Sequence, residues 1–119
     1  MAATLSRIRI TEIVGSSICV SIEDGSRLHD AIIAALGRGE RVSLSFEGVS
    51  RLTTAFLNSA VGQLYNEYSE EQVRTALAPP VQATPEQLGL LKRVVDNAKR
   101  FFADPVRISG IVADTRGDG

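Results

Sequence analysis

The chain is short of the side chains on which most catalytic and metal sites depend. Its 119 residues include one cysteine, Cys19, one histidine, His29, and no tryptophan. One cysteine excludes an internal disulfide and is typical of a reducing compartment. A zinc site would lack Cys and His ligands within one chain, and a Ser-His-Asp or Cys-His mechanism would depend on the single imidazole. We therefore expect no metal site, no cofactor and no enzymatic activity.

Charge and aromatic content argue against nucleic acid and membranes as partners. The 13 Lys and Arg residues nearly balance 14 Asp and Glu residues, and 4 Phe and 2 Tyr residues are too few for a base-stacking platform. The longest fully apolar stretch, Ala31–Leu36, is far shorter than a membrane span. The first twenty residues lack the apolar core of a signal peptide. We expect a cytoplasmic domain.

The N-terminal part has the alternating pattern of two strands. A turn signal at Gly15–Ser17 separates two runs in which apolar and polar residues alternate, which predicts a β-hairpin. In the second run Ile18, Val20 and Ile22 share the apolar face, and Cys19 lies on the opposite face.

A helical period follows the hairpin. An apolar stripe predicts a helix over residues 25–36 that ends at a left-handed Gly37. His29 lies off this stripe, and we interpret it as an exposed surface residue. An alternating strand over residues 41–46 and a second amphipathic helix over residues 54–67 come next. The strand carries serines on one face, so we expect helices on one side of the sheet and more polar surroundings on the other.

The C-terminal part contains a weak strand pattern and a strongly marked helix. Residues 72–77 alternate weakly as a strand, and Thr84–Gln87 offers a capping box with Pro85 at the first helical position. The order ββαβαβα predicts a single α/β domain with a mixed sheet of about four strands and three helices mainly on one face. We place the domain at residues 1–104. We expect residues 105–119 to be a C-terminal extension, with a short strand or loosely packed segment followed by a disordered tail.

The stretch with the most chemical content joins the predicted strand at 41–46 to the predicted helix at 54–67. A short loop leads to Thr53 and Thr54, at a helix start where unpaired N–H groups and the helix dipole favour negative charge. A phosphate added there would place about two negative charges on the surface and repel a partner packed against it. The alternative is that both threonines are plain helix caps.

The same stretch resembles the central segment of STAS domains, and in particular the STAS-like subfamily of unknown function. The likeness is carried mainly by Gly48-Val49 and Phe56-Leu57 within residues 42–57, with a second similar run at residues 90–98. It covers roughly residues 5–103. The resemblance implies a mixed sheet with helices packed against it, in agreement with the order of elements given above.

The resemblance implies a bacterial regulatory module similar to anti-sigma-factor antagonists. Such proteins bind a histidine-kinase-like ATPase or anti-sigma factor and are switched by phosphorylation at the start of the helix after the central strand. By position the acceptor would be Thr54, with Thr53 as the neighbouring candidate. Ser45 and Thr53 stand where the family usually carries aspartate, so the alternative is a module that keeps the surface and has lost the switch. The implied partner surface comprises Ser50, Arg51, Thr53, Thr54 and Asn58.

Two other classes of function remain open from the residues alone. An exposed strand edge, in the sheet or at residues 106–113, could pair between subunits and make the chain an oligomerising assembly component. A small-ligand-binding domain would depend on the single histidine and on scattered carboxylates and hydroxyls.

Overall fold

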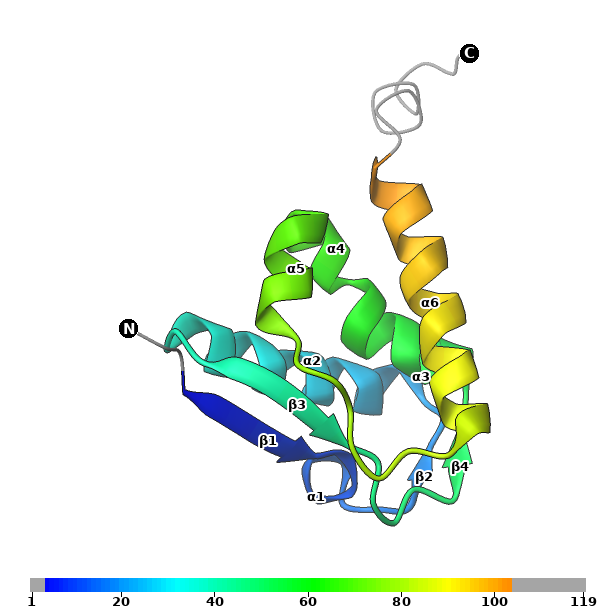
Figure 1. Ribbon diagram of the computed structural model, residues 1–119. Helices are drawn as coiled ribbons and strands as arrows, with labels where there is room; N and C mark the ends of the chain where they lie inside the picture. Colours follow the sequence, from blue (N-terminus) through cyan, green and yellow to red (C-terminus); the bar gives the residue numbers. More distant parts are fainter. Residues whose placement is uncertain (1–3, 104–119) are drawn as a thin grey trace.

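Pairs of parallel strands organise the fold. In the computed structural model, which describes residues 4–103, β1 (Leu5–Arg9) lies parallel to β3 (Arg41–Ser45) (Figure 1). On the other side of β3, residues 77–81 run parallel to it through single bridges at Leu77 and Val81. A second parallel pair joins β2 (Ile18–Cys19) to β4 (Arg51–Leu52).

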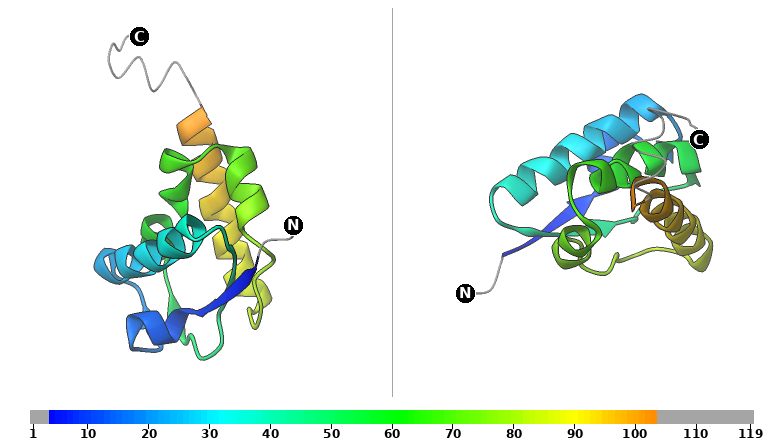
Figure 2. Two further views of the ribbon diagram at one scale, coloured as in Figure 1. Left: turned by 90° about the vertical axis from the view of Figure 1, so that its left-hand side faces the viewer. Right: turned by 90° about the horizontal axis from the view of Figure 1, so that it is seen from above.

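Helices pack together on one side of β1 and β3 (Figures 1 and 2). The stretch 54–67 lies between α2 (Ile22–Gly37) and α6 (Pro85–Ala103). The alternation of side chains along β3 turns its apolar residues toward these helices. Central members of the resulting core, each less than 5% exposed, are Leu28, Ile32, Val42, Leu44, Phe46, Phe56, Leu57, Val61 and Leu64.

The opposite face of β3 is polar but is not open to solvent. Ser43 and Ser45 are only 2% and 3% exposed. Their register partners on β1 are Arg7 and Arg9, and the Ser43 hydroxyl donates a hydrogen bond of 2.9 Å to the carbonyl of Pro79. The expected polar surroundings are therefore present, although the two serines are covered by the neighbouring strands.

The predicted helix at 54–67 is present but is not uniform. It is divided into α3 (Thr54–Leu57), a π-helical turn η1 (Asn58–Gly62) and α4 (Leu64–Glu67). The residues of η1 that face the core, Ala60–Gly62, are all buried. A π turn accommodates one extra residue in a helix, so the apolar stripe can continue across it with an altered phase.

The predicted N-terminal hairpin is wrong. A short helix, α1 (Ile10–Val14), separates β1 from β2, and the two strands pair with different partners. Ile10 and Val14 are both buried and are four residues apart, which is helical spacing. The alternation of apolar and polar residues just before them suggested a strand and obscured this helical pattern. Gly15, at φ 80°, ends α1 in the left-handed conformation.

The predicted faces of β2 are also reversed. Cys19 is fully buried, whereas Ile18, Val20 and Ile22 are 47%, 37% and 63% exposed. Burial here depends on which side of β2 faces the core, and periodicity alone does not fix that side.

Two further local predictions need correction. Residues 72–77 do not form a strand: α5 (Glu70–Ala76) begins at a capping box in which Ser69 and Gln72 bond reciprocally, and pairing with β3 starts only at Leu77. The left-handed glycine after α2 is Gly39, at φ 78°, because the helix continues through Gly37.

The start of the last helix is confirmed. The Gln87 N–H donates to the Thr84 hydroxyl at 3.1 Å, and the Gln87 side chain accepts from the Thr84 N–H at 2.9 Å. The α/β class is confirmed as well, although the order of elements differs from ββαβαβα. Residues 105–119, including the expected strand within 106–113, lie outside the described residues. Within 4–103 no helix is long and apolar enough to cross a bilayer.

Candidate functional site

The junction between β4 and α3 is held in place by hydrogen bonds to β2 and its flanks. The Ser50 hydroxyl donates to the Ser17 carbonyl at 3.2 Å, and the Thr53 N–H donates to the Cys19 carbonyl at 3.3 Å. These bonds fix the strand just before the helix begins, so the side chains of the loop are presented in one arrangement.

Thr53 is the N-cap of α3, and its hydroxyl is fully engaged. Its oxygen accepts a hydrogen bond of 3.2 Å from the Phe56 N–H, and the hydroxyl donates to the Val20 carbonyl at 3.0 Å. The plain capping role considered from the sequence therefore holds for Thr53. Modification of this oxygen would remove both bonds.

Thr54 differs from Thr53 in being available. It is the first residue of α3 and is exposed, and its hydroxyl has no hydrogen-bond partner among the described residues. Asn58 is also exposed and lies one turn further along the helical stretch. The two side chains thus extend the surface that begins at Ser50 and Arg51.

Arg51 and Arg93 are exposed and have free guanidinium groups. Within the described part of the chain neither side chain forms an ion pair or a hydrogen bond. Arg9, Arg27 and Arg38, by contrast, each contact a carboxylate at 3.1–3.3 Å. Positive charge next to the β4–α3 junction is therefore left unneutralised by the described residues.

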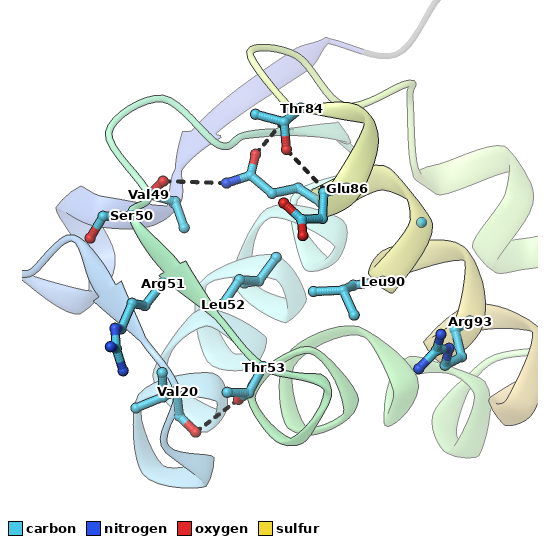
Figure 3. A pocket seen from close by; sticks show the side chains of 12 residues that line it. Val20, Val49, Ser50, Arg51, Leu52, Thr53, Thr84, Glu86, Leu90 and Arg93 are labelled. Atoms are coloured by element: carbon cyan, nitrogen blue, oxygen red, sulfur yellow. Dashed lines mark hydrogen bonds between the residues drawn. The ribbon is translucent and has the colours of Figure 1, made fainter.

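A groove of about 760 Å³ separates the β4 strand from the first half of α6. Figure 3 shows Leu52 and Leu90 between its two sides, with Arg51 and Arg93 at opposite sides. The Gln87 side chain bridges one end by donating to the Val49 carbonyl at 3.3 Å. The lining residues are Val20, Val49, Ser50, Arg51, Leu52, Thr53, Thr84, Glu86, Gln87, Gly89, Leu90 and Arg93.

The structure brings together only part of the surface predicted from sequence. Ser50, Arg51 and Thr53 line the groove, whereas Thr54 and Asn58 lie on α3 and η1 outside its lining. Sequence reasoning missed the contribution of α6. The signal was the pair Leu90 and Arg93, three residues apart and hence on one helix face, but only the tertiary fold places that face opposite β4.

His29 is not the exposed residue that its position off the apolar stripe predicted. Its side chain is only 13% exposed. Nδ1 lies 3.0 Å from the Ala60 carbonyl and Nε2 lies 3.2 Å from a Glu67 carboxylate oxygen. The flank of α2 is covered by η1 and α4, so the imidazole links two helical segments.

Other reactive groups do not converge on the groove. Among residues 4–103 no cluster of three or more His, Cys, Asp or Glu side chains has metal-binding geometry. Cys19 is buried, and burial, with a smaller contribution from the Asp24 charge, raises the pKa of its thiol above the ordinary value. The reactive thiolate form is therefore disfavoured.

Comparison with protein families finds a match for the central segment of the chain. Residues 24–79 match the family described as the STAS-like domain of unknown function. This segment is therefore similar to a STAS-like domain. It runs from α2 to the extended segment beside β3 and includes every residue of the surface predicted from sequence, while the α6 wall of the groove lies beyond the match. No curated protein and no solved structure matches the chain.

Proposed function

We propose that the protein is a non-enzymatic regulatory module that binds a protein partner through the β4–α3 surface, which we define as Ser50, Arg51, Thr53, Thr54 and Asn58. The observation that carries the proposal is the exposed, unbonded Thr54 hydroxyl next to the unneutralised Arg51 on a rigidly held junction of the STAS-like domain. The partner is a histidine-kinase-like ATPase or an anti-sigma factor, the class implied by the resemblance to anti-sigma-factor antagonists.

The proposal includes a switch at Thr54. Phosphorylation of Thr54 leaves the Thr53 cap intact, since the two hydrogen bonds of Thr53 do not involve the Thr54 side chain. The phosphate adds about −1.5 to −2 charges at pH 7. It lies at the start of a helical stretch, where negative charge is favoured, but it changes the charge that an approaching partner meets. Binding and release then differ through electrostatics alone.

A two-step experiment tests the surface and the switch separately. The partner is first captured from the native cell, and binding of purified Arg51→Glu is then compared with that of Arg27→Glu, an exposed arginine on α2 outside this surface. We expect Arg51→Glu to weaken binding and Arg27→Glu to leave it unchanged. Equal affinity for wild type and Arg51→Glu would refute the surface.

The switch is tested with the captured kinase and ATP. Intact-mass and fragmentation mass spectrometry should place one phosphate on Thr54 and none on the Thr54→Ala variant. Phosphate found only on residues other than Thr53 and Thr54 refutes the switch and leaves a module that binds without one.

Assembly is the second candidate function, and a specific observation favours it. Ile18, Val20 and Ile22 on and beside β2 are 37–63% exposed, which is high for three neighbouring branched apolar side chains. An edge strand with such side chains can pair between copies of the chain. Light scattering at high concentration distinguishes the two, because a strict monomer excludes self-assembly.

A further inference from the structure

The groove between β4 and α6 has a composition that selects a particular kind of ligand. Leu52 and Leu90 are half-buried and lie between its two sides, so the middle of the groove is apolar (Figure 3). Arg51 comes from one side and Arg93 from the other. A ligand that fits both features carries an apolar side chain in its centre and negative charge at both ends.

The charge of the groove is not satisfied by the chain itself. Both guanidinium groups lack a carboxylate partner among residues 4–103. Glu86 is the one acidic residue in the lining, so two positive charges face one negative charge. Guanidinium groups pair with carboxylates through planar, bidentate hydrogen bonds, which favours a carboxylate-bearing ligand over a neutral one.

The strand that forms one wall of the groove favours a peptide segment as its occupant. The groove has a volume of about 760 Å³. The hydrogen bond from Gln87 to the Val49 carbonyl lies at one end, and Thr53 and Arg93 also belong to the lining. The groove is lined by one face of α6 and by an extended strand, an arrangement in which an extended chain can lie along β4. The groove is also continuous with the β4–α3 surface, because Ser50, Arg51 and Thr53 belong to both.

We propose that this groove binds an acidic segment of the partner protein, with one apolar side chain between Leu52 and Leu90 and carboxylates at Arg51 and Arg93. The inference rests on the proposed function, since it names the chemistry of the partner that uses the β4–α3 surface. It also assigns half of the binding site to α6, which the match to the STAS-like family does not include.

The test uses the complete chain and a defined probe. An acetylated and amidated pentapeptide of sequence Glu-Glu-Leu-Glu-Glu is titrated into ¹⁵N-labelled protein, with Lys-Lys-Leu-Lys-Lys as its charge-reversed counterpart. We expect amide signals of residues 49–53 and 86–93 to shift with the acidic peptide and not with the basic one. The affinity should fall as salt is added, because exposed charge pairs are screened. An acidic peptide that shifts no signals at millimolar concentration overturns the proposal.

Variants separate the groove from a general attraction of charges. Arg51→Gln and Arg93→Gln should each weaken peptide binding about twofold to fivefold, the range for exposed ion pairs. Lys92→Gln is the matched control, because Lys92 neighbours Arg93 on α6 but pairs with Asp96 at 3.0 Å outside the groove. Glu86→Gln should strengthen binding. A loss for Lys92→Gln as large as that for Arg93→Gln overturns the proposal.

Two further arms test the apolar centre and the alternative occupants. Leu90→Ala should weaken the peptide while its own spectrum stays that of a folded chain. If inorganic phosphate or ATP shifts residues 49–53 and 86–93 and the peptide does not, the groove is an anion site and the proposal is wrong. If the captured partner binds Arg93→Gln and Leu90→Ala as it binds wild type, yet fails to bind Arg51→Glu, this inference falls and the proposed function stands.

Discussion

The contact of α2 with the helical stretch 54–62 depends on one glycine, and replacing it gives a sharp test of the packing. A Cβ atom at Gly25 would lie 2.5 Å from the Phe56 carbonyl oxygen and 2.8 Å from the Ser59 Cβ. Neither atom is the end of a flexible side chain. Gly25→Ala therefore requires α2 and the start of α3 to move apart, and this movement displaces the junction that carries Thr54.

Two opposing contributions determine how much Gly25→Ala changes the free energy of unfolding. Overpacking of a well-packed interior costs about 1–3 kcal/mol, and contacts this short to backbone justify the upper end. Replacing glycine by alanine within a helix returns about 1 kcal/mol. The net expected loss of unfolding free energy for Gly25→Ala is about 2 kcal/mol. For a domain of this size that loss lowers the melting temperature by about 8 °C.

Thermal and urea unfolding, followed by circular dichroism, provide the measurement. Gly37→Ala is the matched control, since it lies in the same helix with nothing within 4 Å of the added Cβ. We expect Gly37→Ala to be as stable as wild type or slightly more stable. If Gly25→Ala unfolds at the same temperature as Gly37→Ala, the close approach of α2 to α3 described above is wrong.

Two further predictions concern buried titratable groups. His29→Ala removes the hydrogen bonds to the Ala60 carbonyl and to Glu67. This loss should lower the unfolding free energy by about 2 kcal/mol, measured by urea denaturation. An unchanged denaturation midpoint would contradict the role of His29 in linking the helices. The raised pKa of Cys19, due to burial and then to Asp24, means that the unfolded chain releases the thiol proton first as pH rises. Stability should therefore fall as the pH rises through and above the ordinary thiol pKa of about 8.5, and Cys19→Ala should flatten this fall; equal slopes for both proteins would refute it.

Local signals in the sequence were sufficient where one segment determined its own structure. The last helix begins at Pro85 because Thr84 and Gln87 form a capping box, which needs no distant partner. The helix predicted at residues 25–36 exists for the same reason, as its apolar stripe is long and regular. The central segment of the STAS-like resemblance, residues 42–57, is also confirmed, since it lies within residues 24–79, which match that family; the second run at residues 90–98 lies outside the match.

Predictions failed where tertiary contacts decide between local alternatives. Cys19 is buried and Ile18 is exposed because β2 pairs with β4, where the register partner of Cys19 is Leu52, 33 residues away in sequence, and not with β1. Residues 72–77 contain enough β-branched residues to suggest a strand, but the capping box at Ser69 starts a helix first. The α6 half of the groove could not be predicted because Arg93 and Arg51 come to line the same groove only after the helix folds back over β4.

The π turn at η1 (Asn58–Gly62) has a consequence for the order in which the chain folds. A π turn is less stable in isolation than the α-helical turn that the same residues could form. Here His29 of α2 lies 3.0 Å from the Ala60 carbonyl within that turn, and Gly62 closes against the Asn58 side chain. The wide turn therefore gains its stability only after α2 has docked. We expect residues 54–67 to reach their final helical geometry late in folding, together with the docking of α2. The β4–α3 surface therefore forms only when the core is assembled and not from its own segment alone.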